Sequence, residues 1–251
     1  RAVFNKPINN DILGYICGGF LGMVYDNWKT RHNAHHAHPN EKEEDPDIEF
    51  PLIATSKELY EKKKGLEKII IKYQAYYYYP LGAIVSFSNR LGTISYFLKN
   101  RSSKNWWKVL IYLAGLILLF PLPFLIFTPL KALFVFLIVH ITSGIYLANI
   151  FAPNHKGMPE VKKGTKLSFL EQQITTSRNV KGGLITDTLL VGLNYQIEHH
   201  LFTNCPRNKL KLITPYVKEI CNDLNLQYTS VNFTESNKII IKELHSVSLA
   251  I

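Results

Sequence analysis

Two tight clusters of histidine are the residues of this sequence whose type and spacing could support chemistry. The first, HNAHH, occupies residues 32–36, and the second, QIEHH, occupies residues 196–200. On a helix, positions i, i+3 and i+4 share one face, so the imidazoles of each cluster are expected to point the same way. Neutral imidazole binds iron, copper, zinc or nickel. The two clusters together therefore predict a metal site.

A further histidine, His155, closely follows a long apolar run and is a third candidate source of ligands. Six histidines are more than one metal ion usually takes from a protein, so a dinuclear centre is predicted. Its ligands would be His32, His35, His36, His155, His199 and His200. The remaining three histidines are expected to lie outside the centre: His38 precedes a proline, His140 lies within an apolar run, and His245 has no histidine near it in sequence.

Two apolar runs must position these histidines. Val109–Phe127 contains 19 residues without a charge, and Ala132–Ala152 contains 21. A bilayer core of about 30 Å requires about 20 apolar residues in a helix. Only four residues separate the runs, which predicts a transmembrane helical hairpin. The alternative is a pair of buried core helices in a soluble protein.

The distribution of charge supports the hairpin. The chain has 29 lysines and arginines against 19 acidic residues, a net charge of +10; 14 of the basic residues lie in 26–108, 12 in 153–251, and Lys131 alone lies between the runs. The positive-inside rule then places both flanks in the cytoplasm, so the two clusters and His155 face the same side. Anionic lipid accounts for the basic charge, and the sequence contains no nucleic-acid-binding motif.

The sequence therefore predicts an all-α integral membrane protein with one domain in three parts. Residues 1–108 are cytosolic or interfacial, 109–152 form the transmembrane hairpin, and 153–251 form a cytosolic His-rich helical cap. Ile69–Phe87 includes four consecutive tyrosines and is interpreted as an amphipathic interfacial helix, with a third span as the alternative. The segment Lys238–Lys242 is predicted to form a β-strand.

The histidine clusters and their surroundings resemble the membrane fatty acid desaturase superfamily. The resemblance rests on residues 26–40 (DNWKTRHNAHHAHPN) with DPD at 45–47, and on residues 175–202 (TTSRNVKGGLITDTLLVGLNYQIEHHLF). The QIEHH form is similar to the branch containing Δ6/Δ5 front-end acyl desaturases. The resemblance implies a cytosol-facing non-haem di-iron centre. His32, His35 and His36 match its second histidine box, and Gln196, His199 and His200 match its third.

The resemblance also implies roles for residues around the boxes. His155 matches an additional ligand found after the last span, and Asn154 is a candidate for holding a metal-bound water. Glu198 and Asn194 are candidates for orienting imidazoles, although Glu198 could equally be a solvated charge. The family's first box should precede the second, yet no histidine precedes His32. We therefore expect that box upstream of Arg1, and the chain alone to be inactive.

The activity implied is O2-dependent desaturation, in which two iron ions and two external electrons leave a cis double bond in a fatty acyl lipid or acyl-CoA. The electron donor would be of the cytochrome b5 or ferredoxin type. An apolar tunnel would position the acyl chain. Two alternatives remain open at this point: a lipid or alkane hydroxylase of the same di-iron architecture, and a membrane metal-binding protein without redox chemistry.

Overall fold

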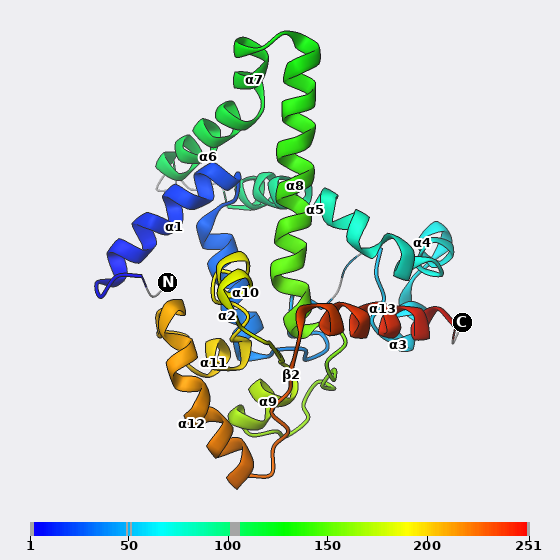
Figure 1. Cartoon of the computed structure of the whole chain (residues 1–251). Coiled ribbons are helices and arrows are strands. Elements are labelled where there is room, and N and C mark those ends of the chain that lie inside the picture. The colour runs from blue at the N-terminus through cyan, green and yellow to red at the C-terminus, as the bar shows by residue number, and fades with distance from the viewer. Residues whose placement is uncertain (1–2, 49, 51, 101–105, 250–251) are drawn as a thin grey trace. The chain divides into compact units, whose positions relative to one another are not determined.

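The computed structural model describes residues 3–48, 50, 52–100 and 106–249, and the regular structure within them is almost entirely helical (Figure 1). This confirms the predicted helical class. A short parallel pairing joins β1 (Asn179–Val180) to β2 (Ser230–Val231). The helices are α1 (Pro7–Leu21), α2 (Tyr25–Ala37), α3 (Lys57–Lys62), α4 (Gly65–Ile71), α5 (Gln74–Lys99), α6 (Trp106–Leu119), α7 (Pro121–Ile126), α8 (Pro129–His155), α9 (Phe169–Thr175), α10 (Leu184–Leu189), α11 (Gln196–Leu201), the 3-10 turn η2 (Arg207–Lys209), α12 (Leu210–Asp223) and α13 (Phe233–Leu249).

The chain forms two compact units. One contains residues 1–31 and 79–148, and the other contains residues 32–78 and 149–251. The second unit holds both histidine clusters and His155. Helices α2, α5 and α8 each continue from one unit into the other.

Helix α8 is the one described helix that is both long and apolar enough to cross a membrane. Only 17% of its most apolar window is buried within the protein. A core helix of a soluble protein would have most of its apolar surface covered. The exposure of α8 therefore favours contact with lipid over the alternative of a buried soluble core.

The other half of the predicted hairpin is not one continuous helix. Helix α6 ends at Leu119, and α7 begins at Pro121 and extends only to Ile126. Proline lacks a backbone N–H, so it is favoured at the first position of a helix and interrupts one that is already under way. The sequence FPLPF at 120–124 therefore divides the 19-residue run at Phe120.

In the first unit, pairs of glycines allow helices to come into close contact. A Cβ placed on Gly115 of α6 would lie 1.7 Å from the carbonyl oxygen of Gly19 in α1. A Cβ on Gly144 of α8 would lie 2.4 Å from the carbonyl oxygen of Gly82 in α5. Small residues at such crossings let two backbones touch, which is typical of helix packing in membranes.

We predict that Gly115→Ala separates α1 from α6 and destabilises the protein by about 1–3 kcal/mol, the range for overpacking. The matched control is Gly92→Ala in α5, where no atom lies within 4 Å of the added Cβ. That change should be neutral or stabilising, because alanine is the better helix former. The melting temperature in detergent distinguishes the two variants, and equal melting temperatures would contradict the prediction.

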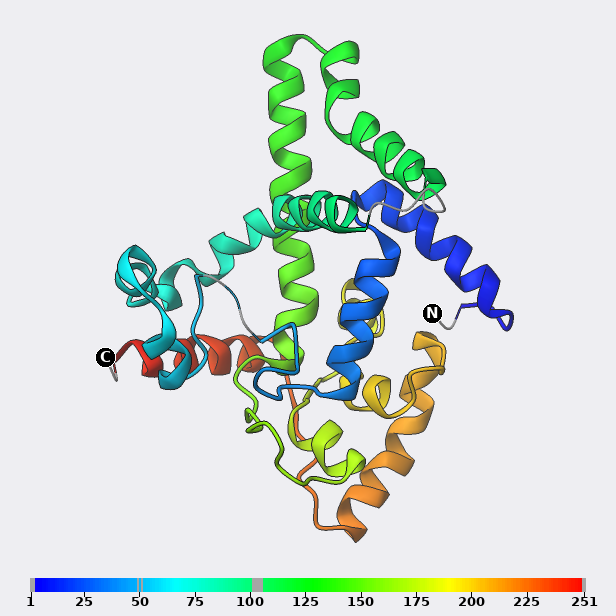
Figure 2. The ribbon, with the colours of Figure 1, turned by 180° about the vertical axis from the view of Figure 1, so that it is seen from behind.

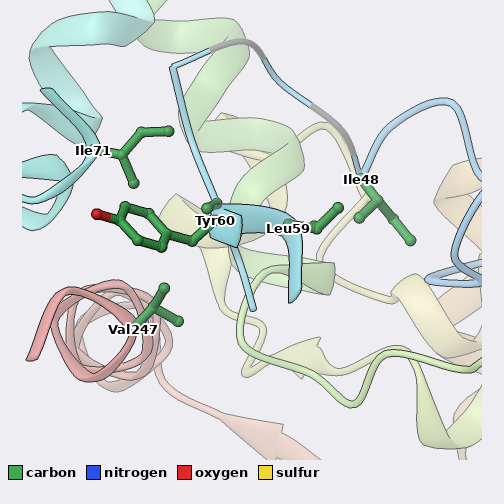
Figure 3. Close-up of a cluster of buried hydrophobic side chains, with 6 residues drawn as sticks. Ile48, Leu59, Tyr60, Ile71 and Val247 are labelled. Carbon is green, nitrogen blue, oxygen red and sulfur yellow. The ribbon is translucent and has the colours of Figure 1, made fainter. Parts of the chain in front are cut away.

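Several apolar cores support the helices of the second unit. One contains Ile48, Leu59, Tyr60, Ile71 and Val247, together with Ala54 (Figure 3). It joins α3 and α4 to α13.

Another core contains Ile174 of α9, Ile197 of α11, and Val217 and Cys221 of α12. Because Ile197 lies within the second histidine cluster, this core fixes the position of α11. The packing of α9 and α12 thus determines where the second cluster is held.

Two segments differ in detail from their sequence interpretation. Lys238–Lys242 is helical and lies within α13, so the strand prediction is wrong. Ser236, Ile240 and Leu244 recur at helical spacing and are buried, which outweighs the β-branched composition of the isoleucines. Ile69–Phe87 is helical but comprises the end of α4, a turn at residues 72–73, and the first half of α5.

Candidate metal centre

Three separate segments bring the six predicted histidines together within the second unit. The last part of α2 carries the first cluster, α8 ends at His155, and α11 carries His199 and His200. The imidazoles form two groups of three, within each of which the candidate ligand atoms lie within 4.8 Å of one another. The groups are named for their first members, the His32 group and the His35 group.

The His32 group consists of His32, His36 and His199. The Nε2 atoms of His32 and His36 are 3.1 Å apart, and the ring centroids of His36 and His199 are 4.7 Å apart. His32 and His36 are one helical turn apart on α2, so both reach His199 from the same side of that helix.

The His35 group consists of His35, His155 and His200. The Nε2 atoms of His155 and His200 are 3.0 Å apart, and the ring centroids of His35 and His155 are 4.6 Å apart. The two groups adjoin, because the ring centroids of His36 and His200 are only 4.2 Å apart. Each cluster therefore contributes to both groups.

Burial favours the neutral form of His32, His199 and His200. Burial, reinforced by the neighbouring histidines, lowers the pKa of His32 to about 2 and that of His199 to about 3. The same two causes hold the pKa of His200 well below its ordinary value. A neutral imidazole has a free lone pair, which is the form that binds a metal.

Each histidine of the His35 group has a hydrogen-bond partner at Nδ1. Nδ1 of His35 donates to Oδ2 of Asp45 at 2.9 Å, that of His200 to Oε1 of Gln173 at 2.7 Å, and that of His155 to the carbonyl oxygen of Thr176 at 3.1 Å. Such bonds fix the tautomer and leave Nε2 as the ligating atom. None of these three partners was singled out from the sequence. The DPD at 45–47 was a usable signal for Asp45, whereas nothing in the sequence marks Gln173 or Thr176.

Asp45 is itself buried and held by several donors. It accepts the backbone N–H groups of Asn40 at 2.8 Å and Asp47 at 2.8 Å in addition to His35. Burial acts to raise the pKa of Asp45, but the hydrogen bond and charge of His35 and these backbone donors lower it overall. His35, Asp45 and Asp47 form a third group within ligand distance. Because Asp45 already accepts from His35, it is placed to orient that imidazole.

Gln196 and Asn154 lie beside His155, next to the His35 group. Nε2 of Gln196 is 2.9 Å from Nε2 of His155, and Nδ2 of Asn154 donates to Oε1 of Gln196 at 3.3 Å. Both amides are buried. Their side chains are therefore close enough to contact a ligand bound at His155.

Glu198 anchors the backbone of α11. Its carboxylate is fully buried and accepts from Nδ2 of Asn179 at 2.7 Å and from the hydroxyl of Tyr228 at 2.7 Å. Asn179 also accepts the backbone N–H of Ile197 at 2.9 Å. Asn194, the other candidate for orienting imidazoles, donates to Asp187 at 2.8 Å. These bonds connect the second cluster to β1 and to the segment before β2.

We predict that Tyr228→Phe removes one of the two side-chain donors to the buried Glu198 and destabilises the second unit by about 1–3 kcal/mol, the cost of an unsatisfied buried group. Tyr216→Phe is the matched control, because Tyr216 is 66% exposed on the neighbouring α12. A lower melting temperature for the first variant alone is expected. Equal effects of the two variants would show that the bond to Glu198 contributes nothing.

The remaining three histidines lie outside both groups. His38 donates to Glu41 at 2.9 Å and is partly exposed, and His245 is exposed on α13. His140 belongs to the first unit, where its Nδ1 lies 3.3 Å from the hydroxyl of Ser86 among phenylalanine rings.

The donor set fits two transition-metal ions. Each group offers three imidazole nitrogens, and imidazole suits iron, copper, zinc or nickel. Three protein donors leave coordination positions for other ligands or a substrate molecule. The geometry alone is therefore compatible with a dinuclear oxygen-activating centre and with a non-redox metal site.

Comparison with known proteins distinguishes these possibilities at the level of family. The family model described as "Fatty acid desaturase" matches residues 1–232. An acyl-lipid (9-3)-desaturase of Physcomitrium patens is 32% identical over 100% of this chain and 49% of its own length. A Delta(6)-fatty-acid desaturase of Caenorhabditis elegans is 30% identical over 97% of this chain and 58% of its own length. A Delta 8-(E)-sphingolipid desaturase of Lachancea kluyveri is 29% identical over 96% of this chain and 46% of its own length.

The chain thus spans about half the length of the curated relatives it matches. The family match covers both histidine clusters and His155. The chain belongs to the fatty acid desaturase family.

Proposed function

We propose that the protein carrying this chain is an O2-dependent fatty acyl desaturase, with iron ions in the His32 and His35 groups. The observation that supports this most directly is the contact between the two groups through His36 and His200, whose ring centroids are 4.2 Å apart. Two adjoining ion sites could act together on one substrate. Overall, two adjacent CH2 groups and O2, with two electrons and two protons, become a cis CH=CH unit and two waters.

In this proposal the two irons supply the oxidising power needed to remove hydrogen from an unactivated methylene. The protein's own residues hold and orient the donors. Asp45, Gln173 and the Thr176 carbonyl keep the Nδ1 protons of the His35 group in place, which would leave each Nε2 free to bind an ion. Gln196 and Asn154 place amide groups beside His155, where they could hold a water or orient a ligand.

We further propose that α6 and α7 together cross the membrane and that α8 returns, forming a hairpin with Lys131 near its tip. The charge distribution supports a cytoplasmic metal centre, since basic residues are concentrated in both flanks. A cytoplasmic donor of the cytochrome b5 or ferredoxin type would then supply electrons. The substrate would be an acyl chain carried by a lipid or by CoA.

Mass analysis of lipids from cells expressing the full-length protein tests this proposal. A new acyl species lacking two hydrogen atoms is expected, and it should be absent with His199→Ala. A species that gains one oxygen atom would instead establish a hydroxylase. Metal analysis of the purified protein gives a second test, because zinc in place of iron would overturn the redox assignment.

A further inference from the structure

Helix α4 and the start of α5 expose an apolar stripe in the second unit. Leu66, Ile69, Tyr73 and Tyr76 are 70%, 64%, 56% and 76% exposed. Leu66 and Ile69 lie one turn apart on α4, Tyr73 lies in the turn at residues 72–73, and Tyr76 lies in the first turn of α5. The opposite side is buried, with Ile71 and Gln74 fully enclosed. The stripe is therefore the outer face of a segment whose inner face is already packed.

Helix α13 has a similar division between two faces. Ser236, Ile240, Leu244 and Val247 are buried. On another face, an open groove of about 580 Å³ runs past residues of successive turns. Residues lining this groove include Phe233, Asn237, Lys238, Ile241, Lys242 and His245. This second stripe lies beyond residue 232, where the family match ends.

The two stripes are held side by side, and together they are named the α4–α13 surface. The rings of Tyr76 and His245 are in edge contact, with centroids 6.5 Å apart. Nε2 of Gln74 donates to the carbonyl oxygen of Leu244 at 3.1 Å, and Val247 packs in the same core as Ile71 (Figure 3). Both ribbon views place α13 beside α3 and α4 (Figure 2). The surface is therefore preformed.

The segments that carry the exposed apolar residues contain an excess of lysine. Residues 61–76 contain five lysines against two glutamates. The groove residues of α13 include Lys238 and Lys242, whereas Glu243 lines a different cavity, beside Lys156 and Gly157. Lysines at the edge of an apolar surface can bury their stems and keep their ammonium groups among lipid headgroups. Tyrosines are enriched at the same depth.

We propose that the α4–α13 surface docks on an anionic phospholipid bilayer, with Leu66, Ile69 and Ile241 entering the interface and the lysines binding acidic headgroups. Charge complementarity favours an anionic bilayer as the partner, because the surface combines exposed apolar side chains with a net excess of lysine. The proposal does not depend on the catalytic activity. An acidic protein partner or a second copy of the chain would be a different occupant, and the experiment separates them.

The test uses the full-length protein reconstituted in nanodiscs. An environment-sensitive fluorophore is attached at Leu66→Cys in a Cys17→Ser background, because Cys17 is an exposed free cysteine. The same background without Leu66→Cys gives the signal to subtract. In nanodiscs containing phosphatidylserine, we expect the label to shift to the blue and to be quenched by spin-labelled lipid, and in pure phosphatidylcholine both effects should be much weaker.

Lys238→Gln/Lys242→Gln should weaken the response to phosphatidylserine by about fivefold per lysine removed. The matched control is Lys162→Gln/Lys166→Gln, which removes two exposed lysines from a loop outside the surface. Metal content and elution volume verify that each variant is folded. Quenching that is absent in both lipids, equal in both, or unchanged by loss of Lys238 and Lys242 would overturn the proposal. So would a signal that depends on protein concentration, because it would assign the surface to a second copy.

Discussion

Replacing His200 with alanine is expected to remove metal from the His35 group and to reduce the desaturated product to background. His200 has two contacts that no other side chain can replace: its Nε2 lies 3.0 Å from that of His155, and its ring adjoins that of His36 in the His32 group. Loss of this imidazole leaves two histidine donors in the His35 group. It also removes the ring that contacts His36 of the His32 group. Iron per chain in the purified full-length protein and product by mass spectrometry are the two measurements.

A graded set of variants tests whether this loss is specific to the centre. Gln173→Ala leaves every imidazole in place but removes the partner of His200 Nδ1. The loss of such a supporting bond is expected to weaken metal affinity by about 10–100-fold. His38→Ala is the matched histidine control, because His38 forms only a partly exposed pair with Glu41. Normal iron content in the His200 variant would remove the basis of the proposed centre.

Arg178→Met is expected to produce the largest loss of stability, and to release metal from the His35 group. Arg178 is fully buried, and its guanidinium donates to the carbonyl oxygens of Pro153 at 2.6 Å and Lys156 at 2.6 Å, and to the hydroxyl of Ser236 at 2.9 Å. Its backbone N–H also donates to the carbonyl oxygen of Asn154 at 2.9 Å. These carbonyls belong to the C-terminal end of α8, the turn that carries His155.

The carbonyls at the end of a helix lack hydrogen-bond donors within the helix and carry partial negative charge. A buried guanidinium there donates hydrogen bonds to them and compensates that charge. Leaving them without Arg178 should cost about 3 kcal/mol, which lowers the melting temperature of a protein of this size by roughly 10 °C. Arg178→Lys should recover part of this, since an ammonium group retains the charge without the planar fork. Lys181→Met, at an exposed position nearby, is the control. Unchanged melting and metal content in Arg178→Met would contradict the assigned role.

The six histidines proposed as ligands could be singled out from the sequence because each cluster is a local pattern. HNAHH and QIEHH each place imidazoles on one helical face, and the structure brings both clusters and His155 together. The partition into two groups was not predictable, because it depends on how α2 meets α11. Thus His35 joins His155 and His200, whereas its neighbours His32 and His36 join His199.

The supporting bonds were the least predictable part. Glu198 was a candidate for orienting an imidazole from its place between Gln196 and His199. Its bonds in the described structure go to Asn179 and Tyr228, 19 and 30 positions away in sequence. Gln173 and Thr176 likewise reach the centre only through tertiary packing. Hydrogen bonds between distant segments leave no periodicity in the sequence that could reveal them.

Among the helices, errors arose where two local signals competed. The apolar run at 109–127 predicted a single helix by length, but Pro121 starts a separate helix, α7. The three consecutive isoleucines at 239–241 predicted a strand by composition, but the spacing of the buried residues in α13 is helical. In the first case a proline outweighed the length of the apolar run. In the second case the helical spacing of the buried residues outweighed the β-branched composition.

The distribution of the six histidines along the chain has a consequence for biosynthesis. Each group includes a residue from α11, so neither group exists on the ribosome until residues 199 and 200 have been synthesised and released from the exit tunnel. A metal ion captured earlier by His32–His36 would lack the ligands from α8 and α11. In the proposed centre, completion of each metal site would follow translation of most of this chain, and an ion joining α2, α8 and α11 would cross-link segments that are distant in sequence.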